Sequence, residues 1–304
     1  MAVIDLSQLP APQVVEVPDF EVLLAERKEV LIALYPAEEQ AAVRAALALE
    51  SDPMVKHLQE STYREILLRQ RINEAAQAVM VAYALGSDLD QLAASYNVSR
   101  LTVTPADAEA VPPVEAVMET DDDLRLRVPA AFEGLSVAGP TAAYEFYAKS
   151  ADGRVADVSA TSPSPAEVLI TVLSREDDGT AAADLLSNVS GALNAETVRP
   201  VADRVTVQGA QIFSYRVQAR LHLFDGVTAG PCLTAANNAL AAYLVEQRRL
   251  GRSVRRESYG AVLRVAGVDW VEMMEPASDI IMDRTQTGYC TATDVTTASQ
   301  EAAT

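Results

Sequence analysis

The chain of 304 residues is poor in the side chains that carry most enzyme chemistry, with two cysteines, two histidines and one tryptophan. Cys232 and Cys290 form no CxxC pattern, so we expect a reducing cytosol and find no support for a disulfide between them. His57 and His222 belong to no HxxxH motif or Asp/His cluster, so no metal site is expected. A nucleophilic serine or cysteine would need a histidine base, and the sequence offers few.

Longer motifs are missing as well. The sequence contains no P-loop, no GxGxxG and no GxSxG nucleophile elbow, so we expect no bound cofactor. No apolar run approaches the roughly 20 residues that a membrane helix needs. The first residues lack a basic region followed by a hydrophobic core, so no export signal is expected. Aromatic residues make up 5%, which argues against stacking platforms for bases or sugars.

Basic residues are outnumbered, since 24 lysines and arginines stand against 43 acidic residues and the formal net charge is −19. We therefore expect neither nucleic acid nor an anionic membrane as a partner, because both attract a basic surface. One basic cluster stands out, formed by Arg248, Arg249, Arg252, Arg255 and Arg256. It either ends a helix and pairs with nearby acids, or it contacts a neighbouring subunit.

The acidic run Asp121 to Asp123 could be a carboxylate cluster for cations or for glycoside chemistry. No glycine-turned calcium loop surrounds it, so capping of a helix N-terminus is the favoured interpretation. Two classes of function remain open. One is a structural protein that assembles with other subunits, and the other is a hydrolytic enzyme with an acid pair that the sequence does not locate. The absence of a base or metal constellation favours the structural class, and we expect no catalytic residue.

The N-terminal third is helical in pattern. Residues 1–18 are rich in proline and aliphatic residues and predict an extended arm. Asp19 is expected to cap a helix that runs to about Tyr35, and a weaker helix follows over residues 37–50. Asp52 and Pro53 then predict the start of a helix that continues to Leu85, roughly 50 Å in length, before Gly86 ends it.

One stripe of this long helix follows steps of three and four residues. Its members are Val55, Leu58, Thr62, Ile66, Arg69, Ile72 and Val79. Because apolar residues alternate with Thr62 and Arg69, the stripe is not a self-sufficient zipper. It either packs against the two preceding helices or contacts another chain, and the pattern leaves both interpretations open.

The remainder changes period and predicts alternating strands and helices. Ser87 with Asp90 resembles a capping box for a short helix, Leu101 to Thr104 predicts a strand, and residues 101–118 form a linker. Alternation at Leu124, Leu126 and Val128 indicates a short strand or an extended lead-in. Thr141 is expected to cap the next helix. Further strands are expected over residues 155–160, 168–173, 205–207, 211–223, 268–274 and 280–282, and helices over 181–193, 231–251 and 258–266.

The predicted fold class is α+β: an N-terminal helical bundle region with a long helix, followed by two tandem small α+β lobes. The expected divisions are an arm at 1–18, a helical region at 19–100, the linker at 101–118, a central lobe at 119–209 and a C-terminal lobe at 210–290. The tail at 291–304 is expected to be frayed.

Several segments together resemble one family. They include DLSQLP at 5–10, YRE at 63–65, RQR at 69–71, TPAD at 104–107, FEGLSVAG at 132–139, SADGRVAD at 150–157, TSPSP at 161–165 and VRPVADRVTV at 198–207. In these segments the chain is similar to the J proteins of the baseplate in contractile-tailed phages and R-type bacteriocins. The resemblance covers nearly the whole length.

The resemblance implies a structural role in the inner baseplate wedge. Two copies would join one smaller, I-like wedge protein through N-terminal helices, and the C-terminal lobes of neighbouring wedges would close a ring around the central hub and spike. The ring would hold the sheath initiator and change shape when contraction is triggered. The protein would assemble in the bacterial host cytoplasm and then reside in the baseplate. Gly134 and Gly139 are candidate pivots between the bundle and the ring lobes.

Overall fold

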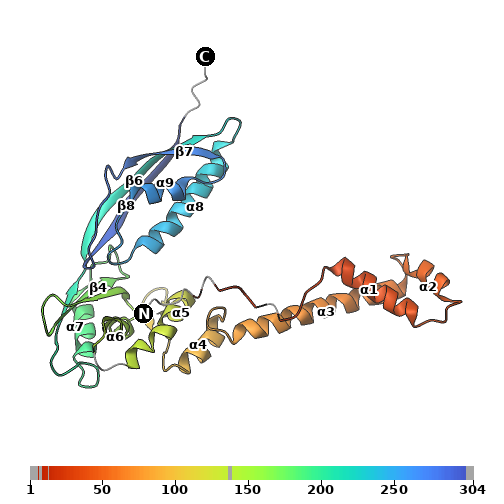
Figure 1. Cartoon of the computed structure of the whole chain (residues 1–304), viewed down its shortest axis with the longest axis horizontal. Coiled ribbons are helices and arrows are strands. Elements are labelled where there is room, and N and C mark those ends of the chain that lie inside the picture. The colour runs from red at the N-terminus through yellow and green to blue at the C-terminus, as the bar shows by residue number, and fades with distance from the viewer. Residues whose placement is uncertain (1–5, 7–8, 13, 136–138, 299–304) are drawn as a thin grey trace, which may run out of the picture. The chain divides into compact units, whose positions relative to one another are not determined.

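The computed structural model describes residues 6, 9–12, 14–135 and 139–298. The chain divides into two compact units, and each is described by itself. The first comprises Met1–Ser99 and Asp121–Pro129, and the second comprises Arg100–Thr120 and Ala130–Thr304. Figure 1 labels most of the elements along the chain.

The first unit is built from helices. They are α1 (Phe20–Ala33), α2 (Gln40–Leu47), α3 (Pro53–Ala78), α4 (Gly86–Ala94) and α5 (Asp121–Ala130), of which α5 ends one residue inside the second unit. Two predicted helix starts are confirmed. The Asp19 carboxylate accepts a hydrogen bond from the backbone N–H of Glu21, and the Asp52 carboxylate accepts one from that of Met54. Both carboxylates thereby bind backbone donors that lack an intrahelical partner.

The long helix α3 ends earlier than the sequence predicts. It has 26 residues, about 39 Å at 1.5 Å per residue, and turns replace the helix before Leu85. The guanidinium of Arg125 donates to the carbonyl oxygens of Val81 and Ala84 at 3.0 and 2.9 Å. Arg125 lies more than 40 residues from this turn, so the sequence around the turn does not predict these hydrogen bonds.

Gly86 has a different role from the one predicted. It is the first residue of α4, with φ of +50°, and its N–H donates to the Asp121 carboxylate at 3.0 Å. The expected capping box is absent, because α4 has no side-chain cap bond. Helix α5 is a second correction: the alternation from Leu124 to Val128 belongs to a helix, not to a strand. Leu124 and Val128 lie four residues apart and are both buried.

The second unit begins with a small antiparallel pair, β1 (Thr102–Thr104) and β2 (Val117–Met118). Strand β1 confirms the expected strand near Leu101–Thr104, whereas β2 is not predicted. Between them, Asp107 and Val114 form an isolated bridge. Residues 101–118, expected to be a plain linker, therefore form a hairpin-like segment whose two ends pair as β1 and β2.

The first lobe of this unit contains α6 (Thr141–Ala151), β3 (Val155–Thr161), β4 (Glu167–Ser174), α7 (Ala183–Leu193) and β5 (Arg204–Gly209), preceded by a 3₁₀ turn η2 (Glu133–Leu135). The sheet order is β3-β4-β5, with β3 antiparallel and β5 parallel to β4. Helix α7 makes the crossover between the parallel strands. Thr141 is the first residue of α6 and makes no side-chain cap bond, so its predicted role as the cap is wrong.

The second lobe contains β6 (Gln211–Leu223), α8 (Ala229–Gln247), α9 (Arg256–Leu263), β7 (Val268–Glu275) and β8 (Gln286–Thr297). The sheet order is β7-β6-β8, and β8 runs parallel to β6. Alternate residues of β6, among them Val217, Ala219 and Leu221, are buried in the core with Ala236 and Leu240 of α8. Helices α8 and α9 cover one face of the sheet (Figure 1).

Strand β8 corrects the expectation of a frayed tail. Residues 291–297 complete a strand of 12 residues, paired with β6 from Gln211 to Leu221. The expected strand at 280–282 is a single bridge between Ile280 and Val254. Cys232 and Cys290 are free thiols. The α+β class is confirmed, with helices first and sheet-containing lobes after them.

Candidate subunit-contact surfaces

The first half of the predicted stripe on α3 is used inside the chain. Val55 is completely buried with Ile32 of α1 and Leu47 of α2, and Leu58 packs against the same cluster. Thr62 is completely buried as well. Of the two interpretations left open, packing against the preceding helices therefore describes this half.

Polar contacts tie the middle of the stripe to the same chain. Ile66 is half-buried, and next to it the Glu65 carboxylate accepts hydrogen bonds from Arg27 of α1 and from Arg69. The bond from Arg27, followed by those from Arg69, lowers the pKa of Glu65. Arg69 also donates to the backbone oxygen of Glu16 in the N-terminal arm at 2.8 Å. The Arg69 guanidinium is thus bonded within its own chain, to Glu65 and to the arm.

The outer sides of α3 carry apolar residues that none of the described residues covers. Tyr63 and Leu67, one turn apart, are 57% and 46% exposed, and Leu68 and Ile72, also one turn apart, are 65% and 47% exposed. At 3.6 residues per turn, the two pairs lie on opposite flanks of the buried face. Of these four, only Ile72 belongs to the stripe that the sequence singles out.

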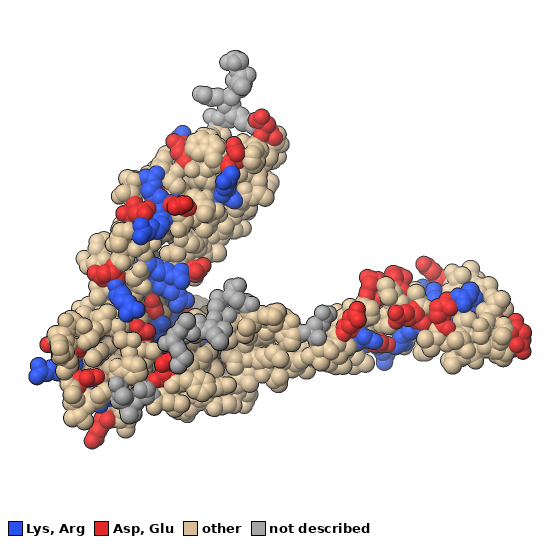
Figure 2. Space-filling view, in the orientation of Figure 1, with Lys and Arg blue, Asp and Glu red and all other residues tan. Residues whose placement is uncertain are grey.

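The exposed apolar surface continues past the helix. Val79, another member of the stripe, is exposed, as are Met80 and Leu85 in the following turns. On the face drawn in Figure 2, charged side chains gather over α1 and the adjoining part of α3, and the stretch of α3 toward α4 shows almost none. A surface of this kind is typical of a site that another protein covers.

The arginine cluster at the end of α8 is mostly engaged within the chain. Arg248 donates to the backbone oxygen of Asp177 at 2.6 Å and lies over the ring of Tyr289. Arg252 pairs with Glu246 at 2.9 Å.

The other members lie at and before the start of α9. Arg255 pairs with Asp279 at 2.9 Å, and Arg256 donates to the backbone oxygen of Met273 at 2.6 Å. The backbone N–H of Arg256, followed by the side chain of Arg255, lowers the pKa of Asp279. Within the described part of the chain, the guanidinium of Arg249 is the one in this cluster without a bonded partner. Pairing with nearby groups is thus present for the other four arginines.

The two candidate pivots lie in tightly packed surroundings. A Cβ on Gly134 would lie 2.6 Å from the ring of Phe146, and the Tyr147 hydroxyl donates to the Gly134 carbonyl. Gly139 has φ of +74°, and a Cβ there would lie 3.0 Å from a carboxylate oxygen of Asp203. Residues 136–138 between them fall outside the described residues.

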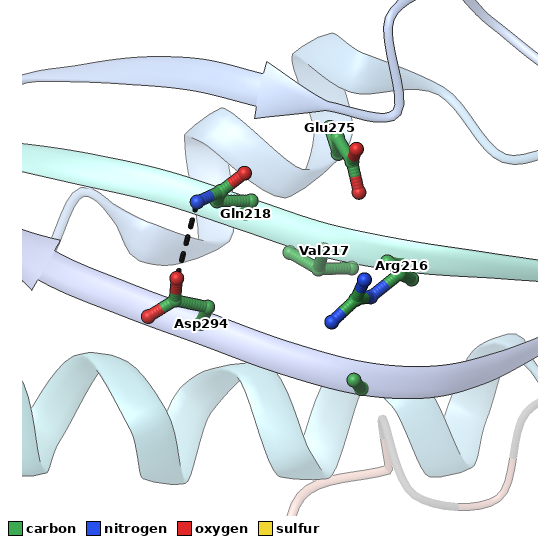
Figure 3. A pocket seen from close by; sticks show the side chains of 6 residues that line it. Arg216, Val217, Gln218, Glu275 and Asp294 are labelled. Atoms are coloured by element: carbon green, nitrogen blue, oxygen red, sulfur yellow. Dashed lines mark hydrogen bonds between the residues drawn. The ribbon is translucent and has the colours of Figure 1, made fainter.

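A shallow depression of about 120 Å³ lies on the sheet of the second lobe (Figure 3). Arg216 and Gln218 of β6, Glu275 of β7 and Asp294 of β8 line it, and Gln218 donates to Asp294 at 3.1 Å. Its charges are mixed and its groups come from three adjacent strands, as on an ordinary solvated sheet face.

The acidic run is a structural feature of α5. Asp121, Asp122 and Asp123 lie in its first turn, where Asp121 accepts the Gly86 N–H and Asp122 pairs with Arg125 at 2.6 Å. Across the described residues, no group of three or more His, Cys, Asp or Glu is arranged to hold a metal ion. None of the helices described is long and apolar enough to cross a membrane.

Comparison with known proteins gives matches along most of the chain. Residues 50–107 match the Baseplate J-like N-terminal domain, residues 136–209 the Baseplate J-like central domain, and residues 215–296 the Baseplate J-like protein C-terminal domain. The chain is 55% identical over 301 residues to Baseplate protein J of Escherichia phage P2. The aligned region covers 99% of this chain and 100% of the phage P2 protein.

Proposed function

The chain belongs to the baseplate J-like family, and from this premise we propose that it is a structural component of the baseplate in a contractile phage tail or tail-like particle. Its role is assembly with other baseplate proteins. The helical first unit joins the wedge, the two lobes of the second unit form the ring around the hub and spike, and the ring passes the contraction trigger through the sheath initiator to the sheath.

The observation that carries the wedge assignment is the pair of exposed apolar flanks on α3. Helix α1 packs against one face of α3, with Val55 and Thr62 buried on it. The flanks at Tyr63 with Leu67, and at Leu68 with Ile72, each remain open. A helix with two open apolar flanks suits a bundle with two further helices, because exposed apolar surface is stabilised when it is covered. A second copy of this chain and one smaller I-like wedge protein would supply them.

Co-expression of the full chain with the smaller wedge protein tests this proposal. Leu68→Glu and Ile72→Glu place a charge on one open flank and are expected to prevent recovery of the complex. Val201→Glu is the matched control, because Val201 is fully exposed in the second unit. Recovery of the intact complex with both flank variants would overturn the bundle assignment.

The ring assignment depends on the second unit, where Arg249 is the member of the arginine cluster whose guanidinium is left to pair with a neighbour. Because the chain carries a net charge of −19, contacts between copies need local positive charge. No observation among the described residues favours the hydrolytic alternative. Gly134 and Gly139 remain candidate pivots for the change of shape on contraction.

A further inference from the structure

We infer that Arg69, Asn73 and Tyr83 form a binding site that recognises the main chain of a peptide segment. Its ligand is the N-terminal arm of the same chain. When the arm is bound, it stabilises the turns at residues 79–85 that separate α3 from α4. The inference goes beyond the proposed function and does not depend on it.

Asn73 is the centre of the site. Its side-chain oxygen accepts hydrogen bonds from the backbone N–H groups of Val14 and Val15 at 3.0 and 2.9 Å. Its side-chain nitrogen donates to the backbone oxygen of Val15 at 2.8 Å. One amide group thus uses both its donor and its acceptor on the main chain of the arm.

Arg69 and Tyr83 extend the contact in both directions. Arg69 lies one helical turn before Asn73 and donates to the backbone oxygen of Glu16 at 2.8 Å. The Tyr83 hydroxyl donates to the backbone oxygen of Leu9. The arm therefore runs antiparallel to α3. Every one of these bonds ends on a backbone atom of the arm, so the site selects the course of the main chain and not particular side chains. The chain bends at Val14 and Val15, and this bend brings both N–H groups to one oxygen.

The arm also continues the cover that α1 provides. Val55 and Thr62 are buried on the face of α3 that packs against α1. Arg69 and Asn73 follow on the same helical face, and there the arm takes the place of α1. This accounts for the two polar residues at positions where an apolar stripe would otherwise continue.

The bracing follows from where the bonds lie along the chain. Arg69 and Asn73 belong to α3, which ends at Ala78, whereas Tyr83 lies in the turns after it. The arm is therefore bonded on both sides of the break. The turns also have backbone hydrogen bonds of their own and the two bonds from Arg125. We expect the arm to add to these contacts and to hold α3 and the chain leading into α4 in one arrangement.

Hydrogen exchange on the full chain tests the inference, with Asn73→Ala and Tyr83→Phe as variants and Gln70→Ala as an exposed polar control on α3. Asn73→Ala should speed exchange of the Val14 and Val15 amides roughly tenfold or more, because it removes their acceptor. It should also speed exchange in residues 79–85. Tyr83→Phe keeps the ring and should speed exchange in 79–85 with little effect at Val14 and Val15. Gln70→Ala should change neither region.

Protected exchange of the α3 amides near the buried Thr62 shows that each variant is folded. Unchanged exchange of Val14 and Val15 in Asn73→Ala would overturn the binding site. Release of the arm with unchanged exchange in residues 79–85 would overturn the bracing. Asn73→Asp provides a second check, because it keeps an acceptor for the two N–H groups and removes the donor to Val15. The exchange rates of the Val14 and Val15 amides in Asn73→Asp should lie between those of the parent protein and of Asn73→Ala. Rates as fast as in Asn73→Ala would contradict the proposed geometry.

Discussion

The guanidinium of Arg154 binds the carboxylate of Asp152 at 2.9 Å and extends to Asp184 of α7 at 2.7 Å. Asn188, also on α7, donates to the same Asp152 carboxylate at 2.9 Å. The turn between α6 and β3 is thereby fastened to the helix that crosses the first lobe. Burial alone would raise the pKa of Asp152, but the bonds from Arg154 and Asn188 outweigh it and lower the pKa to about 2.

This arrangement predicts a pH-dependent stability. The pKa of Asp152 is lower in the folded protein than its ordinary value of 3.8, so its contribution is complete above about pH 4 and is lost as pH falls toward 2. Asp152→Asn should reduce the free energy of unfolding by about 2 kcal/mol at pH 7, and this difference should shrink between pH 4 and pH 2. Urea unfolding followed across that range measures it. A difference that stays constant down to pH 2 would contradict the prediction.

The two sides of α3 should respond differently to substitution. Val55→Ala removes buried methyl groups from the cluster with Ile32 and Leu47 and should cost about 2 kcal/mol of stability in the first unit. Ile72→Ala, at an exposed position, should leave stability nearly unchanged and weaken binding to the wedge partners. Thermal unfolding and affinity measured on the same samples separate the two effects. Equal losses of stability in both variants would show that Ile72 is needed for folding.

The stripe predicted on α3 shows which contacts can be inferred from the sequence and which cannot. A step of three and four residues identifies a covered face, and Val55, Leu58 and Thr62 lie on it. It does not show whether the cover comes from the same chain, because α1 and a foreign helix would select the same residues. Apart from Ile72, the exposed flanks are formed by apolar residues outside the stripe, such as Tyr63 and Leu68, and these residues were the available signal.

Most other elements were predictable from period and turns, and the failures share a cause. Strand β8 is rich in threonine, so its residues 291–297 resemble a polar tail, yet pairing with β6 makes them a strand. The end of α3 at Ala78 accompanies bonds from Arg125, which lies more than 40 residues away. Helix α5 buries Leu124 and Val128, so tertiary packing overrides a local alternation. In each case the deciding contact is distant in the chain.

The arginine cluster should divide into structural and contact residues. Arg249→Glu is expected to impair ring closure without lowering the melting temperature, because its guanidinium has no bonded partner within the described chain. Arg248→Glu should lower the melting temperature, because it removes the bond to the Asp177 carbonyl and the contact with Tyr289. Electron microscopy of assembled baseplates and thermal unfolding measure the two outcomes, with Arg264→Glu, on an exposed arginine after α9, as the control. Normal rings with Arg249→Glu would remove Arg249 from the neighbour contact.

The two candidate pivots make the last prediction. Gly139→Ala should cost about 1–2 kcal/mol, because φ of +74° is unfavourable for a residue with a Cβ. Gly134→Ala should cost about 1–3 kcal/mol, because its Cβ would overlap the Phe146 ring. If the segment is a pivot, the backbone angles at Gly134 or Gly139 must differ between baseplates solved before and after contraction. The Tyr147 bond to Gly134 should then break or shift in one state, since it fastens the segment to α6. Unchanged angles at both glycines would assign them to packing alone.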